Sequence, residues 1–161
     1  HLPAFHRSIR KAQTEHPRFY FFDLGVKRFL ERSIESPLVE STFAYGEAFE
    51  HFLILEFYRL NSYLEKDYRL SYFRSKEGQK IDLIISPNRK EEILIEIKAT
   101  KRVDLDEVAK LQRLASNFNT KSVLYLSQDP NPQKIDQVLC LPWQKGLAHV
   151  FPELGNSLVG G

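Results

Sequence analysis

The sequence of 161 residues contains one cysteine, Cys140, and no methionine. A single thiol cannot close an internal disulfide bond or build a Cys-based zinc site, so both are excluded, and Cys140 is most simply a buried apolar residue. No apolar run approaches the roughly 18 residues that a transmembrane helix needs, and the N-terminus has no apolar stretch of signal-peptide length. We therefore expect a cytoplasmic protein with no membrane partner.

Glycine and histidine are also sparse, and their positions exclude further kinds of site. The seven glycines form neither a Walker A sequence nor the Gly-rich turn of a dinucleotide-binding fold, so this chain should not itself bind ATP. None of the five histidines has the two-histidine spacing of a helical zinc site. His51 adjoins the candidate site residue Glu50, but an ordinary packing role is the simpler interpretation.

The residues that are present can bury a core, since 42% of the chain is apolar. The net charge of +2 is too small to indicate nucleic-acid binding by itself. Basic charge is nevertheless concentrated: residues 1–29 carry six Lys or Arg against two acids, and residues 68–102 carry nine against five. Two solvated surface faces would give the same pattern, so a nucleic-acid function needs a second signal.

The chain divides into a basic N-terminal arm and one folded domain. Residues 1–18 contain two prolines and show no periodicity, so we expect an arm or linker from a missing upstream domain, followed by a domain over residues 19–161. The lack of an initial methionine fits a fragment of a longer chain. Asp23 suits the N-cap of a short helix over residues 24–31. Helically spaced apolar residues predict a central helix over residues 41–64.

Three strand-like runs follow the central helix and predict a meander. They are RLSYFRS at residues 69–75, IDLIIS at residues 81–86 and EILIEIKA at residues 92–99. A second helix is expected after the N-cap Asp104, with an apolar stripe of Leu105, Val108, Leu111, Leu114 and Ala115. Two more strands are expected at residues 122–127 and 135–143. The order of helix, three strands, helix, strand and strand predicts an α/β fold on a mixed sheet.

The second and third strands pair best as a hairpin in which Asp82 faces Glu96 and Ile84 faces Leu94. The midpoint of that register falls in SPNRKEE, where turn-forming residues independently place the reversal. Alternation then puts Asp82, Glu96 and Lys98 on one face. The other face carries Ile81, Leu83, Ile93, Ile95 and Ile97. Two carboxylates facing each other in apolar strands repel, so a cation is expected between them.

A hard divalent cation, Mg²⁺ or Mn²⁺, suits a pair of carboxylates that leaves room for water and phosphate oxygens. Lys98 would point its ammonium group at the same place, where it could orient or help to deprotonate the attacking water and neutralise charge on a phosphate. Glu50 offers a third carboxylate, because it lies in the apolar stretch GEAFEHF, where an uncompensated charge is costly. Glu47, one turn earlier, is the alternative ligand.

Each of these residues also has an ordinary structural explanation. Glu96 and Lys98 could form a solvated pair on an exposed strand face. Asp82 could begin a strand next to a turn, and Glu50 could be a surface acid of the helix. Glu56 is expected to pair with Arg59 or another basic residue. Gln112, on the helix after the third strand, could reach the edge of the site, but a solvated glutamine is the simpler interpretation.

The pattern of Glu50 in a helix, Asp82 in one strand and Glu96-Ile97-Lys98 in the next resembles the signature of PD-(D/E)XK nucleases. Four blocks further resemble the domain that follows the AAA+ module in many prokaryotic ATP-binding proteins: FYFFDLGVKRFL, GEAFEHFLILE, YFRSKEGQKIDLII and ILIEIKAT. This resemblance covers about residues 1–126. The sequence departs from it in two ways, since members often carry an acid where Lys80 stands, and the proline of the signature's name is missing before Asp82.

The resemblance implies a restriction-endonuclease-like core and a magnesium- or manganese-dependent nuclease site. Glu50, Asp82 and Glu96 would hold the metal, the backbone carbonyl of Ile97 would be an extra ligand, and Lys98 would position the attacking water. The reaction would be hydrolysis of phosphodiester bonds, with DNA favoured over RNA as the substrate.

Partners follow from the same resemblance. Arg74, Lys76 and Lys80 would contact the DNA backbone, and an upstream ATPase domain of the same polypeptide would bind ATP. A homo-oligomer would also be compatible with such a machine. The alternative is a catalytically inactive module of the same fold that binds DNA or protein partners or regulates the ATPase.

Overall fold

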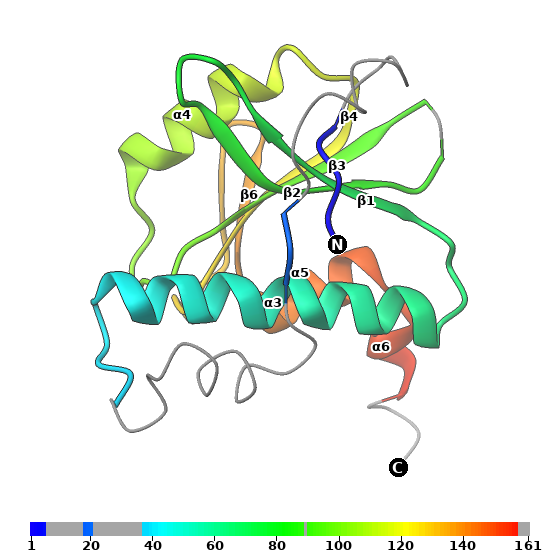
Figure 1. Ribbon diagram of the computed structural model, residues 1–161, viewed down its shortest axis with the longest axis horizontal. Coiled ribbons are helices and arrows are strands. Elements are labelled where there is room, and N and C mark those ends of the chain that lie inside the picture. Colours follow the sequence, from blue (N-terminus) through cyan, green and yellow to red (C-terminus); the bar gives the residue numbers. More distant parts are fainter. Residues whose placement is uncertain (6–17, 21–36, 89, 158–161) are drawn as a thin grey trace.

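The computed structural model describes residues 1–5, 18–20, 37–88 and 90–157. In these ranges one six-stranded mixed sheet lies between helices (Figure 1). Helices α3 and α5 contribute to the apolar cluster on one face of the sheet, and α4 contributes to the cluster on the other. The α/β class predicted from the sequence, with its mixed sheet, is confirmed.

The elements follow the predicted order. They are α3 (Phe43–Tyr63), β1 (Arg69–Arg74), β2 (Lys80–Ser86), β3 (Glu92–Ile97), α4 (Leu105–Ala115), β4 (Thr120–Ser127), β5 (Gln133–Ile135), β6 (Val138–Pro142), α5 (Trp143–Val150) and α6 (Glu153–Ser157). In the sheet the strand order is β1-β2-β3-β4-β6-β5. The first three strands form the antiparallel meander, while β4 is parallel to β3 because α4 carries the chain back across the sheet.

Local chemistry explains where the two helices nearest the site begin. The side chain of Thr42 accepts a hydrogen bond from the backbone N–H of Tyr45 at the start of α3. Asp104 accepts hydrogen bonds from the N–H groups of Asp106 and Glu107 at the start of α4, as the sequence predicted. These caps fix where each helix leaves its loop, and therefore which side chains of its first turns reach the sheet.

The hairpin of β2 and β3 has the predicted register, with Ile84 paired to Leu94. On its other side β2 contains a bulge, because Ser71 of β1 pairs with Ile84 whereas Phe73 pairs with Ile81. Two residues of β2 therefore face one residue of β1. The bulge turns Ile81 toward the α4 side, together with Ile84 and Leu94. The prediction that Ile81 shares a face with Leu83 was wrong for this reason.

Two other predictions need correction. The strand expected over residues 135–143 is a hairpin of β5 and β6, in which Ile135 pairs with Val138 and Asp136 has a positive φ of 50° in the connecting turn. Leu105, expected in the apolar stripe of the second helix, is 65% exposed because it occupies the first position of α4, before the helix faces the sheet.

The described part of the predicted arm packs against the domain. Leu2, Ala4 and Phe5 are buried, and the backbone of residues 3 and 5 exchanges hydrogen bonds with Tyr72 of β1. Leu2 pairs in turn with Arg18. Residues 2–5 therefore add to the core beside β1. The cap at Asp23 and the short helix over residues 24–31 lie outside the described residues.

No helix among the described residues is long and apolar enough to cross a membrane.

The packing of α5 on the sheet gives a stability test. A Cβ atom added at Gly146 would overlap the side chain of Leu126, which is fully buried in β4. Gly146→Ala should therefore lower the free energy of unfolding by about 1–3 kcal/mol, because a packed core does not yield to an extra methyl group. Gly46→Ala is the matched control, since a Cβ atom there meets nothing within 4 Å in α3.

Denaturation in urea would measure both variants. Gly46→Ala should leave stability unchanged or raise it by up to about 1 kcal/mol, since alanine is the better helix former. Equal stability of the two alanine variants would contradict this description of the contact between α5 and β4.

Candidate functional site

Asp82 lies where the hairpin of β2 and β3 stops pairing. The last described pair before it is Leu83 with Ile95, and the Asp82 carboxylate then accepts a hydrogen bond of 3.0 Å from the backbone N–H of Ile97. A side chain thus replaces a strand carbonyl as the partner of that N–H group. Asp82 is fully buried, and its other oxygen lies 2.7 Å from the ammonium group of Lys80. The bulge in β2 and the loss of pairing together place this carboxylate at the level of the sheet.

Glu96 and Lys98 lie side by side on β3 and just beyond it, as alternation predicted. The Lys98 ammonium is 3.0 Å from a Glu96 oxygen and 2.9 Å from an oxygen of Glu107 in the first turn of α4. Glu107 also binds Lys110 at 2.6 Å. Lys98 therefore has two carboxylate partners that hold its position, and the sequence did not identify one of them, Glu107.

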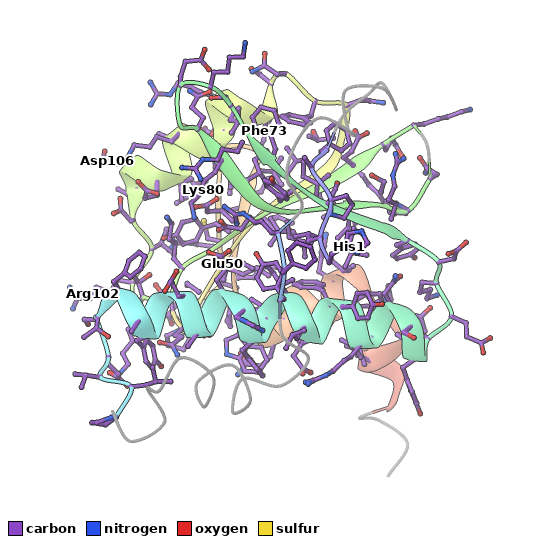
Figure 2. All side chains as sticks on the ribbon, in the orientation of Figure 1. His1, Glu50, Phe73, Lys80, Arg102 and Asp106 are labelled. Carbon is purple, nitrogen blue, oxygen red and sulfur yellow. The ribbon has the colours of Figure 1, made fainter. Side chains whose placement is uncertain are left out.

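Glu50 lies on α3, on the side of the helix that faces Lys80 (Figure 2). One of its oxygens accepts hydrogen bonds from Arg18 at 3.1 Å and from the hydroxyl of Tyr20 at 3.2 Å, and the other lies 3.8 Å from the Lys80 ammonium. Lys80 consequently lies within ion-pair distance of both Glu50 and Asp82. The ammonium group of Lys80 is thus a cation beside Asp82, but it lies toward Glu50 and not between Asp82 and Glu96, where the sequence predicted one.

The pKa values of the two glutamates are both raised in the folded protein. Burial, and after it the charge of Asp82, raises the pKa of Glu96 to about 7, although Lys98 acts in the opposite direction. Burial and the charge of Asp82 also raise the pKa of Glu50. Asp82 is therefore the acid that both glutamates sense, one from each side of the sheet.

The environment of Lys98, the lysine of the predicted signature, favours the charged form of its side chain. Burial alone would lower the pKa of Lys98, but the carboxylates of Glu96 and Glu107 outweigh it and raise that pKa. Hydrogen bonds from Lys110 and Lys98 in turn lower the pKa of Glu107 to about 2. Lys98 is therefore an ammonium ion at neutral pH, fixed between two acids.

Two cavities meet at Lys80. The first, of about 440 Å³, lies between the β1–β2 turn and α4 and is lined by Glu96, Glu107, Lys110 and Arg113 as well as Lys80. The second has a volume of about 480 Å³ and contains Glu50. A ligand could thus approach the carboxylates from either side of Lys80.

The structure separates the three predicted phosphate contacts. Lys80 is bound to Asp82, Arg74 lines the cavity that contains Glu50, and Lys76 lies exposed in the β1–β2 turn. Sequence reasoning missed Arg18 and Tyr20, which reach Glu50 from a segment about 30 residues away. No local pattern in the sequence marks such a contact.

The remaining polar residues behave mostly as expected. Glu56 pairs with Arg59 at 2.6 Å, Cys140 is buried, and His51 is buried in α3. Glu47, the alternative ligand, lines the same cavity as Glu50. Gln112 is half-buried and is not among the residues that line the cavity of Glu96.

The carboxylates of the site meet some, but not all, of the requirements for binding a divalent cation. Among the residues that the structure describes, no group of three His, Cys, Asp or Glu side chains is arranged to hold a metal ion. Asp82 and Glu96 are nevertheless buried oxygen donors, and Mg²⁺ often binds one or two protein carboxylates, with water in its other positions. Asp82 and Glu96 therefore fit such an ion if the Lys80 ammonium leaves Asp82.

The raised pKa of Glu96 gives a prediction for stability against pH. Between about 4.5, the ordinary value, and about 7, the folded protein binds more protons than the unfolded chain, so stability should fall as pH rises through this window. Glu96→Gln should remove the part of this slope that Glu96 contributes. At pH 8 it should be as stable as the wild type or more stable, by up to about 3 kcal/mol, since one pKa unit corresponds to about 1.4 kcal/mol.

Urea denaturation from pH 4.5 to pH 8 in EDTA measures this slope. Glu91→Gln is the control, because Glu91 is an exposed carboxylate in the loop between β2 and β3 and its loss should preserve the wild-type slope. A wild-type slope in Glu96→Gln as well would show that Glu96 is not the buried acid described here.

Comparison with known families gives one result. Residues 45–145 match the model named Domain of unknown function (DUF4143), and comparison with curated proteins finds no match. The matched region runs from the start of α3 to the start of α5 and so includes Glu50, Asp82, Glu96, Lys98 and the whole sheet. Since the match spans well over half of the sequence, the chain belongs to the DUF4143 family.

Proposed function

We propose that this domain is a metal-dependent phosphodiesterase of the PD-(D/E)XK type that acts on DNA. One observation carries the proposal: two mutually repelling carboxylates, Asp82 and Glu96, are buried at the end of a hairpin beside a fixed ammonium ion, Lys98. Burying such a group of charges is costly and adds little to stability, so it is more typical of a reactive site than of a structural one. Glu96 lines one open cavity, and Lys80, which is bound to Asp82, lines both.

Asp82 and Glu96 would hold Mg²⁺ or Mn²⁺, with Glu50 and the backbone carbonyl of Ile97 as the further predicted ligands. The ion would polarise the phosphoryl oxygen and lower the pKa of bound water. For Asp82, the hydrogen bond from the Ile97 N–H fixes one oxygen and leaves the other for the ion once Lys80 has moved.

Lys98 would act as a cation and not as a proton acceptor. Its two carboxylate partners keep its pKa raised, so at neutral pH it retains its proton. An ammonium ion at this position can donate a hydrogen bond to the attacking water and stabilise negative charge that develops on the phosphate. Glu107 is a positioning residue, since it holds Lys98 from α4.

We propose that the domain acts as part of a cytoplasmic ATP-driven machine. This part rests on the resemblance to domains that follow an AAA+ module, in which the upstream module of the same polypeptide binds ATP. The phosphodiesterase would then act on DNA that the ATPase has moved or opened.

The alternative is an inactive module that binds DNA or a protein partner or regulates the ATPase. A specific observation favours it as the second candidate: each carboxylate already has a cationic partner, Lys80 for Asp82, Lys98 for Glu96 and Arg18 for Glu50. Such a network can be retained without catalysis. The two functions differ in whether the wild-type chain cleaves DNA at all.

Plasmid nicking tests the leading proposal. The wild-type chain should nick supercoiled DNA in Mg²⁺ or Mn²⁺ but not in EDTA, and Asp82→Asn and Glu96→Gln should abolish nicking. Lys98→Met should lower the rate at saturating metal by about 100-fold or more, because removing one preorganised donor commonly costs that much. Glu107→Gln should lower it less, since Lys98 keeps its bond to Glu96.

Glu91→Gln serves again as the control and should nick like the wild type. Absence of nicking in a correctly folded wild-type chain, over a range of metals and DNA forms, would support the inactive module. Full activity of Lys98→Met would exclude the proposed role of the lysine.

Salt dependence tests the DNA contacts independently of cleavage. In EDTA, affinity for a labelled duplex with a single-stranded tail should fall steeply with salt, because each contacted phosphate releases counterions. Arg113→Glu and Lys76→Glu should each weaken binding and reduce the slope of log K against log salt by about 1. Lys121→Glu is the control, since Lys121 lies at the start of β4, at the sheet end opposite Ile97.

A salt-independent affinity, or an equal effect of all three charge reversals, would show that Arg113 and Lys76 are not the proposed DNA contacts. The measurement is fluorescence anisotropy at several salt concentrations.

A further inference from the structure

The cavity beside Glu50 is walled by aromatic rings as well as by charges. Phe19 and Phe43 line it together with Arg74 and Lys80. Phe43 belongs to the first turn of α3, while Phe19 comes from the N-terminal segment beside Arg18. Two segments that are distant in sequence therefore bring a phenyl ring each to one opening.

These rings are unusually exposed. Phe19 is 77% and Phe43 is 83% exposed, and they are two of the four exposed aromatic residues among the described part of the chain. The other two, Tyr58 and Tyr63, do not line this cavity. An apolar ring that stays in water beside a charged cavity suggests a surface that becomes covered when a ligand binds.

The inner wall of the cavity is held in place by contacts that do not involve the exposed rings. The Tyr20 ring packs edge-on against His51 at 5.1 Å, and its hydroxyl donates to Glu50. The Arg18 guanidinium lies 4.7 Å from the centre of the Tyr72 ring and also binds Glu50. The cavity thus has fixed polar side chains beside two exposed rings, of which Phe19 also contacts the His1 ring, with 6.2 Å between the ring centroids.

Exposed aromatic faces next to cations are the usual means of binding single-stranded nucleic acid. Each base stacks on a ring, while Arg and Lys contact the phosphates. A base within a duplex is already stacked between its neighbours and is not free to use such a face. The cavity, of about 480 Å³, is large enough for a base and shares Lys80 and Glu50 with the proposed site.

We propose that this cavity binds an unpaired base, so that the substrate class of the domain is single-stranded DNA or the single-stranded tail of a duplex. The base stacks on Phe43, with Phe19 at the same opening, and Arg74 contacts an adjacent phosphate. The strand then continues past Lys80 toward Asp82 and Glu96. This inference rests on the proposed function, because it identifies the substrate of that same site.

Fluorescence anisotropy in EDTA tests the inference without cleavage. The probes are a labelled single-stranded oligonucleotide and the same sequence as a blunt duplex. The wild-type chain should bind the single strand at least 10-fold more tightly. Phe43→Ala should weaken single-strand binding by about 5- to 100-fold, the range for loss of one stacking ring, with little effect on the duplex.

Tyr63→Ala is the matched control, because Tyr63 is also 83% exposed on α3 but lies at the other end of that helix. It should change neither affinity by more than about twofold. Phe43→Leu separates stacking from simple apolar contact and should also weaken single-strand binding. Thermal melts establish that all three variants are folded, as expected for exposed positions.

The outcomes are distinct. Equal or tighter binding of the blunt duplex, or wild-type single-strand binding by Phe43→Ala, would overturn the inference while leaving a duplex nuclease in place. Absence of binding to either form would overturn the DNA function together with the inference. A single-strand preference that depends on Phe43 and not on Tyr63 would support it.

Discussion

The repulsion between Asp82 and Glu96 is the constraint on which the rest of the site depends. A buried carboxylate needs a cation or hydrogen-bond donors beside it. Two buried carboxylates at the end of one hairpin need more such partners than the strand backbone supplies. The chain provides Lys80 for Asp82 and Lys98 for Glu96. Burial and the charge of Asp82 nevertheless raise the pKa of Glu96, so the two lysines do not fully offset them.

The fold serves this arrangement in three ways. The bulge in β2 and the end of strand pairing place Asp82 at the level of the sheet. The parallel crossover through α4 brings Glu107 to Lys98, and α3 brings Glu50 to the opposite side. Each of these elements lies within residues 45–145, the region that matches the DUF4143 family.

Much of the fold and of the candidate site could be predicted from the sequence, because several of their features depend on residues that are close together in the chain. The register of β2 and β3 follows from two-residue alternation and a turn at its midpoint, and the pairing of Glu96 with Lys98 follows from their spacing. The bulge could not be foreseen, since IDLII is apolar on both faces. The sequence gives a weak indication that Glu107 contacts Lys98, because Glu107 lies in the first turn of a helix that begins shortly after Lys98. Contacts made by Arg18 depend on tertiary packing alone.

Anomalous diffraction from crystals of this chain soaked in Mn²⁺ would test the central claim most directly, because it locates a metal without relying on activity. The account predicts one peak between the carboxylates of Asp82 and Glu96, with the Lys80 ammonium displaced from Asp82 and Lys98 still bound by Glu107. A peak at neither carboxylate, with Lys80 still in its ion pair with Asp82, would contradict it. In that case the lysine would be the permanent counter-ion of a site that takes no metal.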